Sequence, residues 1–161
     1  MKIKVKQCKK ILIEYLYLDL KTCQRCMGTD KVLDSVLLTL KPVLEVAGFS
    51  VEYRKIEIES ADMAIQYQFL SSPTIRVNSE DIFQSVVEND CGCCSEISGT
   101  KVKCRVFEYE GRNYEVPTRQ MLVNAILRSI YGEHTNCSNE YHLPENLKEF
   151  FEGKQHKKLT K

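Results

Sequence analysis

Cysteine is the residue type best suited to chemistry in this chain, which contains eight cysteines among 161 residues. Thiolates act as nucleophiles in disulfide exchange and as ligands for soft metal ions. Cys23 and Cys26 form a C-x-x-C pair, and four other cysteines lie between residues 91 and 104. The spacing therefore defines two groups of thiols that could each carry a function.

The C-x-x-C pair follows an apolar segment over residues 10–20 and precedes a stretch with helical periodicity. Between a strand and a helix, such a pair is typical of a redox-active dithiol. A cysteine at a helix N-terminus faces unpaired N–H groups and the positive end of the helix dipole, which favour the thiolate. We therefore expect Cys23 to be the nucleophile. Cys26 is in register with the apolar face of the helix, which predicts a shielded resolving thiol.

Two charged residues are candidates for tuning the pKa of these thiols. Arg25 would favour a thiolate through its positive charge, or it would be an exposed residue of the first helical turn. Glu14 interrupts the apolar segment and would be either a proton acceptor for Cys26 or a carboxylate that reaches solvent or a lysine. A C-x-x-C pair is also half of a zinc site, and residues 28–30 would allow a helix to begin only after the pair. The sequence leaves these alternatives open.

The second group of thiols is Cys91-Gly92-Cys93-Cys94, in an irregular segment over residues 81–100. The glycine would let the backbone turn tightly, so that Cys91 and Cys93 converge on one ion or form a disulfide, with Cys94 as a further donor. Three thiolates suit zinc, copper(I), arsenic(III) or mercury(II). The same thiols would alternatively exchange electrons with Cys23, hold an ion together with the C-x-x-C pair, or clip the loop through a structural zinc ion.

The remaining cysteines are not expected to take part in chemistry. Cys104 shares a strand face with Val102 and Val106, which predicts burial in the core. Cys8 and Cys137 lie in exposed or terminal segments. The three histidines all fall in the C-terminal region, where no cysteine spacing pairs with them in a ligand pattern.

Strands and helices alternate in the segments that must position these thiols. Apolar periodicity predicts strands over residues 10–20, 49–58 and 74–77, with a long helix after the first and a short helix capped by Ser60 after the second. A hairpin over residues 101–116 and a helix ending at Gly132 complete the order. This order predicts an α/β fold.

A single domain accounts for most of a chain of this length. We expect it to span residues 1–131, with residues 81–100 as a cysteine-rich insertion. Residues 132–161 would form a C-terminal extension with a short helix before Gly153 and a frayed basic tail.

Composition excludes several functional classes. Lysine and arginine number 23 and aspartate and glutamate 22, so no strong positive field draws the chain to nucleic acid or to a membrane surface. No apolar run is long enough to span a bilayer. The basic and then apolar N-terminus is interrupted by Glu14 and Asp19, and no small-residue cleavage site follows. We therefore expect a cytoplasmic protein with reduced cysteines.

Several motifs resemble the thioredoxin-like superfamily over residues 10–78 and 101–131: a strand, CQRC, a helix containing LKPVLEVAG, the strand SVEYRKIEI, and AIQYQFLSSPTIRV. The resemblance implies a βαβα-ββα fold in which Ser72-Pro73 is a cis peptide beside the C-x-x-C pair. Pro73 would then shape a groove for an extended substrate chain, with Ser72 and Thr74 as substrate-binding residues. Without the resemblance, Pro73 would be a trans proline that opens an ordinary strand.

A closer resemblance extends to the CGCC segment and to CRVFEYEGRNYEVP, and it points to a bacterial and archaeal thioredoxin-like group of unknown function. The chain lacks the tryptophan before the C-x-x-C pair and the Gly-Pro between its cysteines that are typical of thioredoxins. The resemblance therefore implies a fold more firmly than a substrate or a redox potential.

These observations predict a thiol–disulfide oxidoreductase that acts on a protein or small-molecule disulfide and needs no cofactor for the dithiol step. Its electron donor is not indicated. The alternative is a non-catalytic protein that binds zinc, copper(I) or an arsenic(III)-type ion through Cys91, Cys93 and Cys94, with or without the C-x-x-C pair. A third possibility is an interaction module stapled by zinc.

Overall fold

The computed structural model describes residues 8–83, 85–132 and 140–159. Cys137 and His134 lie outside the described residues. The elements, in chain order, are β1 (Lys9–Tyr17), α1 (Gln24–Val46), β2 (Phe49–Glu57), α2 (Ala61–Gln66), β3 (Thr74–Val77), β4 (Glu80–Asp81), β5 (Val87–Asp90), α3 (Gly92–Ser98), β6 (Lys103–Tyr109), β7 (Arg112–Tyr114), α4 (Arg119–Tyr131) and α5 (Glu145–Leu159).

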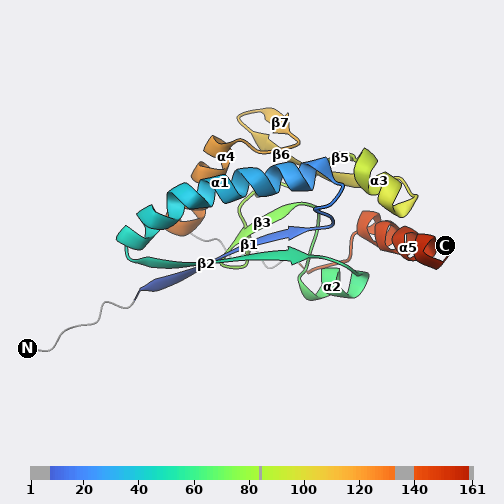
Figure 1. Ribbon diagram of the computed structural model, residues 1–161, viewed down its shortest axis with the longest axis horizontal. Helices are drawn as coiled ribbons and strands as arrows, with labels where there is room; N and C mark the ends of the chain where they lie inside the picture. The colour runs from blue at the N-terminus through green and yellow to red at the C-terminus, as the bar shows by residue number, and fades with distance from the viewer. Residues whose placement is uncertain (1–7, 84, 133–139, 160–161) are drawn as a thin grey trace, which may run out of the picture.

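The main sheet has four strands in the order β2-β1-β3-β4 (Figure 1). β1 pairs in parallel with β2 and antiparallel with β3, and β4 completes the antiparallel edge. A second sheet, β5-β6-β7, is antiparallel throughout. The fold is therefore mixed α/β, as the alternating patterns predict.

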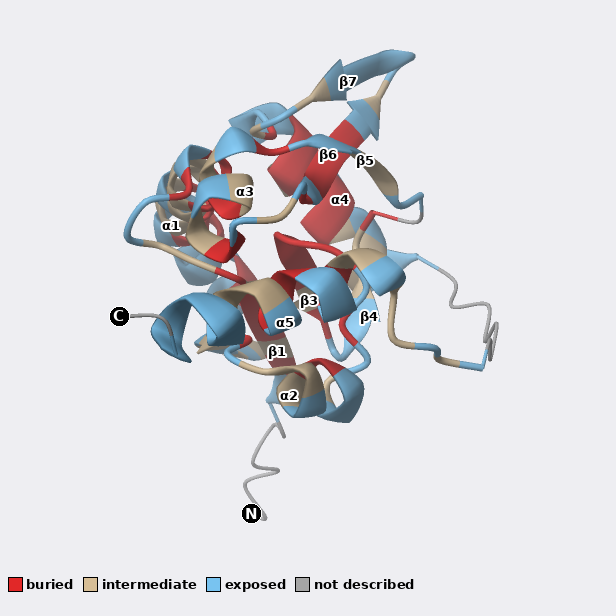
Figure 2. Ribbon diagram, turned by 90° about the vertical axis from the view of Figure 1, so that its right-hand side faces the viewer, coloured by how far each residue is buried: buried red, intermediate tan, exposed pale blue. Residues whose placement is uncertain are grey.

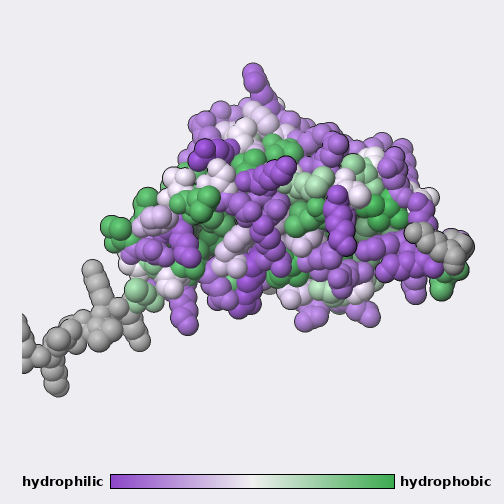
Figure 3. Space-filling view, viewed as in Figure 1, coloured by the Kyte–Doolittle hydropathy of each residue, from purple (hydrophilic) through white to green (hydrophobic). Residues whose placement is uncertain are grey.

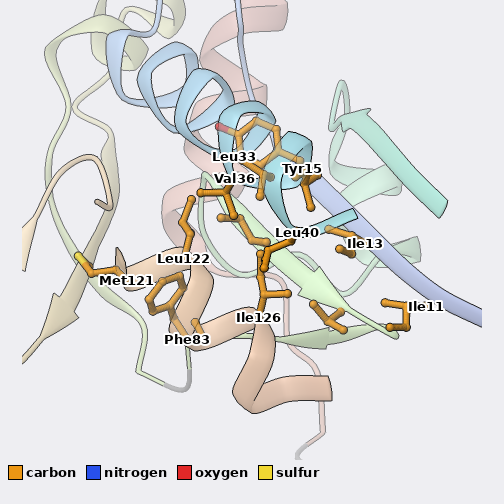
Figure 4. Packing of buried hydrophobic residues seen from close by; sticks show 14 of the residues in the cluster. Ile11, Ile13, Tyr15, Leu33, Val36, Leu40, Phe83, Met121, Leu122 and Ile126 are labelled. Atoms are coloured by element: carbon orange, nitrogen blue, oxygen red, sulfur yellow. The ribbon is translucent and has the colours of Figure 1, made fainter. Parts of the chain in front are cut away.

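Two hydrophobic cores lie along the chain's main sheet. The first packs α1 and α4 against one face of β1 and β3 (Figure 4). It includes the fully buried side chains of Ile13, Leu33 and Ile126. The second core lies beyond the carboxyl end of β1, where α3 and α5 lie side by side (Figure 2), and it contains most of the described cysteines.

Helix α1 begins at Gln24, so the C-x-x-C pair belongs to its first turn and not to a preceding loop. Cys23 has an extended backbone and is the N-cap. The carboxylate of Asp19 accepts hydrogen bonds from the Cys23 amide at 2.8 Å and from the amide and hydroxyl of Thr22. Asp19 thereby closes the turn between β1 and α1, which explains why the helix starts immediately after Cys23.

Residues 81–100 are more regular than expected, because they contain strand β5 and helix α3. The hairpin that follows is confirmed as β6 and β7. Its turn has two residues with positive φ, Glu110 at 51° and Gly111 at 76°. Such a pair of left-handed residues matches the twist of a tight hairpin.

Helix α5 differs from the prediction, because it continues through Gly153 to Leu159. A Cβ atom on Gly153 would lie 2.4 Å from the carbonyl oxygen of Ser98, so the glycine lets α5 approach the end of α3 closely. Leu147, Phe150 and Phe151 are buried in the second core. Tertiary packing therefore supports helical residues that a sequence pattern treats as a helix terminus.

The outer surface mixes hydrophilic and hydrophobic side chains over the side formed by α1 (Figure 3). Three hydrophobic residues of α1 are largely exposed: Leu38, Val43 and Val46. Within the described ranges, none of the helices combines the length and apolar character needed to cross a membrane.

Substitution of Gly153 by alanine tests the packing of α5 on α3. We expect Gly153→Ala to lower the free energy of unfolding by about 1–3 kcal/mol, because the new methyl group meets the Ser98 carbonyl. Gly92→Ala is the matched control, since a Cβ atom there meets nothing within 4 Å. Urea denaturation measures both variants. Equal midpoints for Gly153→Ala and the wild type would contradict the close packing.

Candidate functional site

Four buried cysteines meet in the second core: Cys23, Cys91, Cys94 and Cys104. Their Sγ atoms all lie within 4.8 Å of one another. The Sγ atoms of Cys94 and Cys104 are 3.4 Å apart. Cys91 is 3% exposed and the other three are 0% exposed. We call this group the four-thiol site.

Three separate segments supply these thiols. Cys23 is the N-cap of α1, and Cys91 is the N-cap of α3. Cys94 is the third residue of α3, so one helical turn places it beside Cys91. Cys104 projects from β6, and the Ser95 hydroxyl ties α3 to that strand by donating to the Cys91 carbonyl and accepting from the Val102 amide.

The structure groups the thiols of residues 91–104 differently from the sequence prediction. Cys93 is half-buried and lies outside the four-thiol site, whereas Cys104 belongs to it. The expected convergence of Cys91 and Cys93 assumed a tight turn, but α3 brings together residues three apart. Cys91 and Cys94 are themselves a C-x-x-C pair, and this signal was available in the sequence. Cys104 is buried as expected, although it faces sulfur as well as apolar side chains.

Cys26 is buried beside the four-thiol site but is not part of it. Its Sγ atom lies 3.3 Å from the Ser72 hydroxyl, and it also interacts with the Cys23 thiol. The Tyr15 hydroxyl donates to the Cys26 carbonyl at 2.6 Å. The Ser72-Pro73 peptide bond is cis, as the resemblance implied.

Ser72 and Thr74 are occupied by contacts within the chain. The Ser72 carbonyl accepts a hydrogen bond from the Arg105 amide at 2.8 Å, so β6 lies where a substrate chain was expected. The Ser72 hydroxyl accepts from the Leu18 amide, and the Thr74 hydroxyl donates to the Ser71 carbonyl. Ser72 is 1% exposed and Thr74 is 2% exposed. A substrate-binding role for these residues, or for Pro73, stays a prediction.

Arg25 joins the segments that carry the thiols. Its guanidinium donates to the carbonyls of Asp90 at 2.9 Å and Cys104 at 3.3 Å, and it forms an ion pair with Glu115 at 3.0 Å. Asp90 directly precedes Cys91 in the chain. Because its contacts are to carbonyl oxygens and a carboxylate, Arg25 positions the backbone of two cysteines. The sequence predicted either a charge that tunes a thiol pKa or an exposed residue, and the second alternative is wrong because Arg25 is buried.

Glu14 is not placed to accept a proton from Cys26. Side chains alternate along β1, so Glu14 lies on the face opposite to Tyr15, whose hydroxyl reaches the backbone of Cys26. In the sheet register, Glu14 stands between Arg54 of β2 and Arg76 of β3. The alternative expected a carboxylate that reaches solvent or a lysine, but Glu14 is buried and its neighbours across the sheet are arginines.

The thiols tune one another's pKa values. Hydrogen bonding from Cys104, followed by Cys26 and Cys91, holds the pKa of Cys23 far below its usual range. Hydrogen bonding with Cys104 lowers the pKa of Cys91 to about 7. The pKa of Cys26 is raised, first by its hydrogen bond with Cys23 and then by burial. Hydrogen bonding with Cys104 raises the pKa of Cys94, and hydrogen bonding with Cys23 raises that of Cys104. Cys23 is therefore the preferred thiolate.

The geometry of the four-thiol site suits a soft ion. A tetrahedral zinc ion with Zn–S bonds of about 2.3 Å requires S–S separations of about 3.8 Å. Separations of at most 4.8 Å therefore need only small shifts of the side chains. The site offers sulfur ligands alone, which excludes calcium and magnesium, since these ions require oxygen ligands.

The family described as Domain of unknown function (DUF2703) matches residues 11–126. The chain belongs to this family. The matched residues of the DUF2703 domain include all four thiols of the site, together with Arg25 and Cys26. They do not include α5, so part of the cover of the site comes from outside the DUF2703 match. No curated protein and no solved structure matches the chain.

Substitution of Arg25 tests its positioning role in the DUF2703 domain. We expect Arg25→Ala to lower the free energy of unfolding by about 2 kcal/mol, because two backbone carbonyls lose a charged donor. The buried thiols should also react faster with a thiol reagent in the native state. Arg54→Ala is the control, since it breaks an exposed ion pair and should change neither quantity measurably. Wild-type thiol reactivity in Arg25→Ala would show that the contacts of Arg25 are not needed to keep the thiols buried.

Proposed function

We propose that this chain binds a thiophilic metal ion through Cys23, Cys91, Cys94 and Cys104. The observation that carries the proposal is the meeting of four buried sulfur atoms within 4.8 Å of one another. A single ion bound to all four sulfur atoms would account for the convergence of thiols from three segments. Four thiolate ligands in a closed site are typical of structural zinc.

Several features would stabilise such an ion. Cys23 lies at the N-terminus of α1, whose dipole favours negative charge. Arg25 fixes the backbone on both sides of the β5-to-β6 segment that supplies the other three thiols. Leu147, Phe150 and Phe151 of α5 complete the apolar surroundings and exclude water. Because the ligands come from distant segments, the free energy of metal binding would contribute directly to folding.

The charge of the complex distinguishes the candidate ions. Four thiolates around a divalent ion leave a net charge of about −2, which is costly in an apolar core unless donors compensate it. A trivalent ion such as arsenic(III) with three thiolates forms a neutral complex, and copper(I) is also compatible with sulfur ligands. Zinc makes use of all four sulfur atoms, so it is the ion we propose first.

Metal analysis of the purified protein tests the proposal. We expect one zinc ion per chain, and serine substitution of any of the four cysteines should weaken binding by more than about 100-fold, because a ligand is lost. Cys93→Ser is the matched control, since its thiol neighbours Cys94 in sequence but lies outside the site. Native mass spectrometry and competition with a chelator measure stoichiometry and affinity. Equal losses in Cys93→Ser and Cys94→Ser would contradict the assignment of ligands.

Arsenic(III) and copper(I) titrations of the reduced protein form the other arms of this test. A preference for three thiolates should appear as tolerance of one of the four serine substitutions. Failure of all three ions to bind with one-to-one stoichiometry would refute a metal-binding function.

We also propose, as a second candidate, that a thioredoxin-like scaffold carries dithiol chemistry at Cys23 and Cys26. The strand order β2-β1-β3-β4 and the position of the pair in the first turn of α1 support it. The lowered pKa of Cys23 and the raised pKa of Cys26 match the roles of nucleophile and resolving thiol. Because both thiols are fully buried, a protein disulfide would reach them only if covering elements move.

Serine variants test the dithiol candidate on the metal-free, reduced protein. Cys23→Ser should abolish reduction of a model disulfide, and Cys26→Ser should accumulate a mixed disulfide at Cys23, because no resolving thiol remains. Gly153→Ala should reduce the model disulfide faster than the wild type does if α5 limits access to Cys23. Intact mass and a coupled reductase assay measure these effects. Wild-type activity in both serine variants would refute the candidate.

A further inference from the structure

Cys26 is a buried thiol that the four-thiol site does not use. It lies in the same helical turn as Cys23, and its Sγ atom contacts the Ser72 hydroxyl at 3.3 Å. It is 0% exposed, and its thiol interacts with that of Cys23. A fifth thiol kept in contact with one of four candidate ligands provides a chemical partner for that ligand.

Cys23 therefore belongs to two groups at once. It is a member of the four-thiol site and also the first cysteine of the C-x-x-C pair. A sulfur atom in a disulfide has lost the negative charge that makes a thiolate a good ligand. Coordination of the ion by Cys23 and a disulfide at Cys23 consequently exclude each other. Disulfide formation therefore weakens metal binding to the site, and metal binding weakens disulfide formation by the same free energy.

We propose that peroxide oxidation of Cys23 and Cys26 to a disulfide releases the metal ion, which makes the site a redox-controlled store of that ion. This inference rests on the proposed metal-binding function. It assigns Cys26 the role of the thiol that removes a ligand from the ion.

The reaction balances with one equivalent of hydrogen peroxide. The Cys23 sulfur attacks one peroxide oxygen, the O–O bond breaks, and Cys23 becomes a sulfenic acid while the second oxygen leaves as water after protonation. The Cys26 sulfur then attacks the Cys23 sulfur, the S–O bond breaks, and a second water leaves. Two sulfur atoms together lose two electrons, the peroxide gains two, and the metal ion keeps its oxidation state.

The burial of the site selects the class of oxidant. All four thiols of the site and Cys26 are at most 3% exposed, so a large disulfide cannot reach them in this conformation. Hydrogen peroxide is small and uncharged, and it can enter through brief local openings. Once the disulfide forms, Cys91, Cys94 and Cys104 remain as three ligands, and the affinity for a four-coordinate ion falls.

The experiment follows zinc-loaded full-length protein after addition of hydrogen peroxide. A chromogenic chelator records zinc release, intact mass records the loss of two hydrogen atoms, and peptide mapping locates the disulfide. We expect the wild type to release its zinc with a disulfide between Cys23 and Cys26, and to bind zinc again after reduction. Cys26→Ser should lose zinc without forming this disulfide and without recovery after reduction, because its sulfenic acid is oxidised further.

Cys93→Ser is the matched control and should behave as the wild type, since it removes a nearby thiol that belongs neither to the four-thiol site nor to the C-x-x-C pair. Peptide mapping of the oxidised wild type tests the inference even if Cys26→Ser fails to fold. A disulfide that joins any other pair of cysteines during zinc release overturns the inference. Equal and reversible release from wild type and Cys26→Ser also overturns it, while zinc binding itself stands. Absence of stoichiometric zinc before oxidation refutes the proposed function and this inference together.

Discussion

Four sulfur atoms packed in an apolar core impose the central constraint on this molecule. Two neighbouring thiolates repel each other strongly where water is excluded, so full ionisation of the group needs a compensating positive charge. Hydrogen bonds among the thiols act in opposite directions, so that the pKa of Cys23 is lowered and the pKa of Cys94 is raised. The N-terminus of α1 and the hydrogen bonds of Arg25 to the Asp90 and Cys104 carbonyls hold the sulfur atoms together despite this repulsion.

The two sheets position different cysteines of the four-thiol site. The core between α1, α4 and the main sheet is built mainly from apolar side chains, and it fixes the direction in which α1 presents Cys23. The smaller sheet brings Cys104 to the same place, because the Arg105 amide donates a hydrogen bond to the carbonyl of Ser72, which lies two residues before β3 of the main sheet. Asn146 of α5 adds a second link by accepting from the Lys103 amide and donating to its carbonyl. The four-thiol site therefore lies where the main sheet, the smaller sheet and α5 are joined.

Sequence patterns predicted the elements better than their partners. The strands at residues 49–57 and 74–77, the Ser60 cap and the Pro73 isomer follow from local sequence or family resemblance. The exchange of Cys93 for Cys104 in the site depends on α3, a helix of seven residues whose periodicity is too short to detect in advance. The role of Arg25 depends on carbonyl groups of β5 and β6, and no side-chain pattern can show these contacts.

The order of the segments along the chain has a consequence for synthesis on the ribosome. Cys23, Cys91, Cys94 and Cys104 all precede α5, the helix whose Leu147 and Phe150 cover them. A growing chain therefore presents every ligand of the site before its cover has been made. Under the proposed metal-binding function, the docking of α5 would set a time limit for loading: an ion that arrives during translation would be enclosed as the helix docks, whereas a later ion would wait for that helix to open.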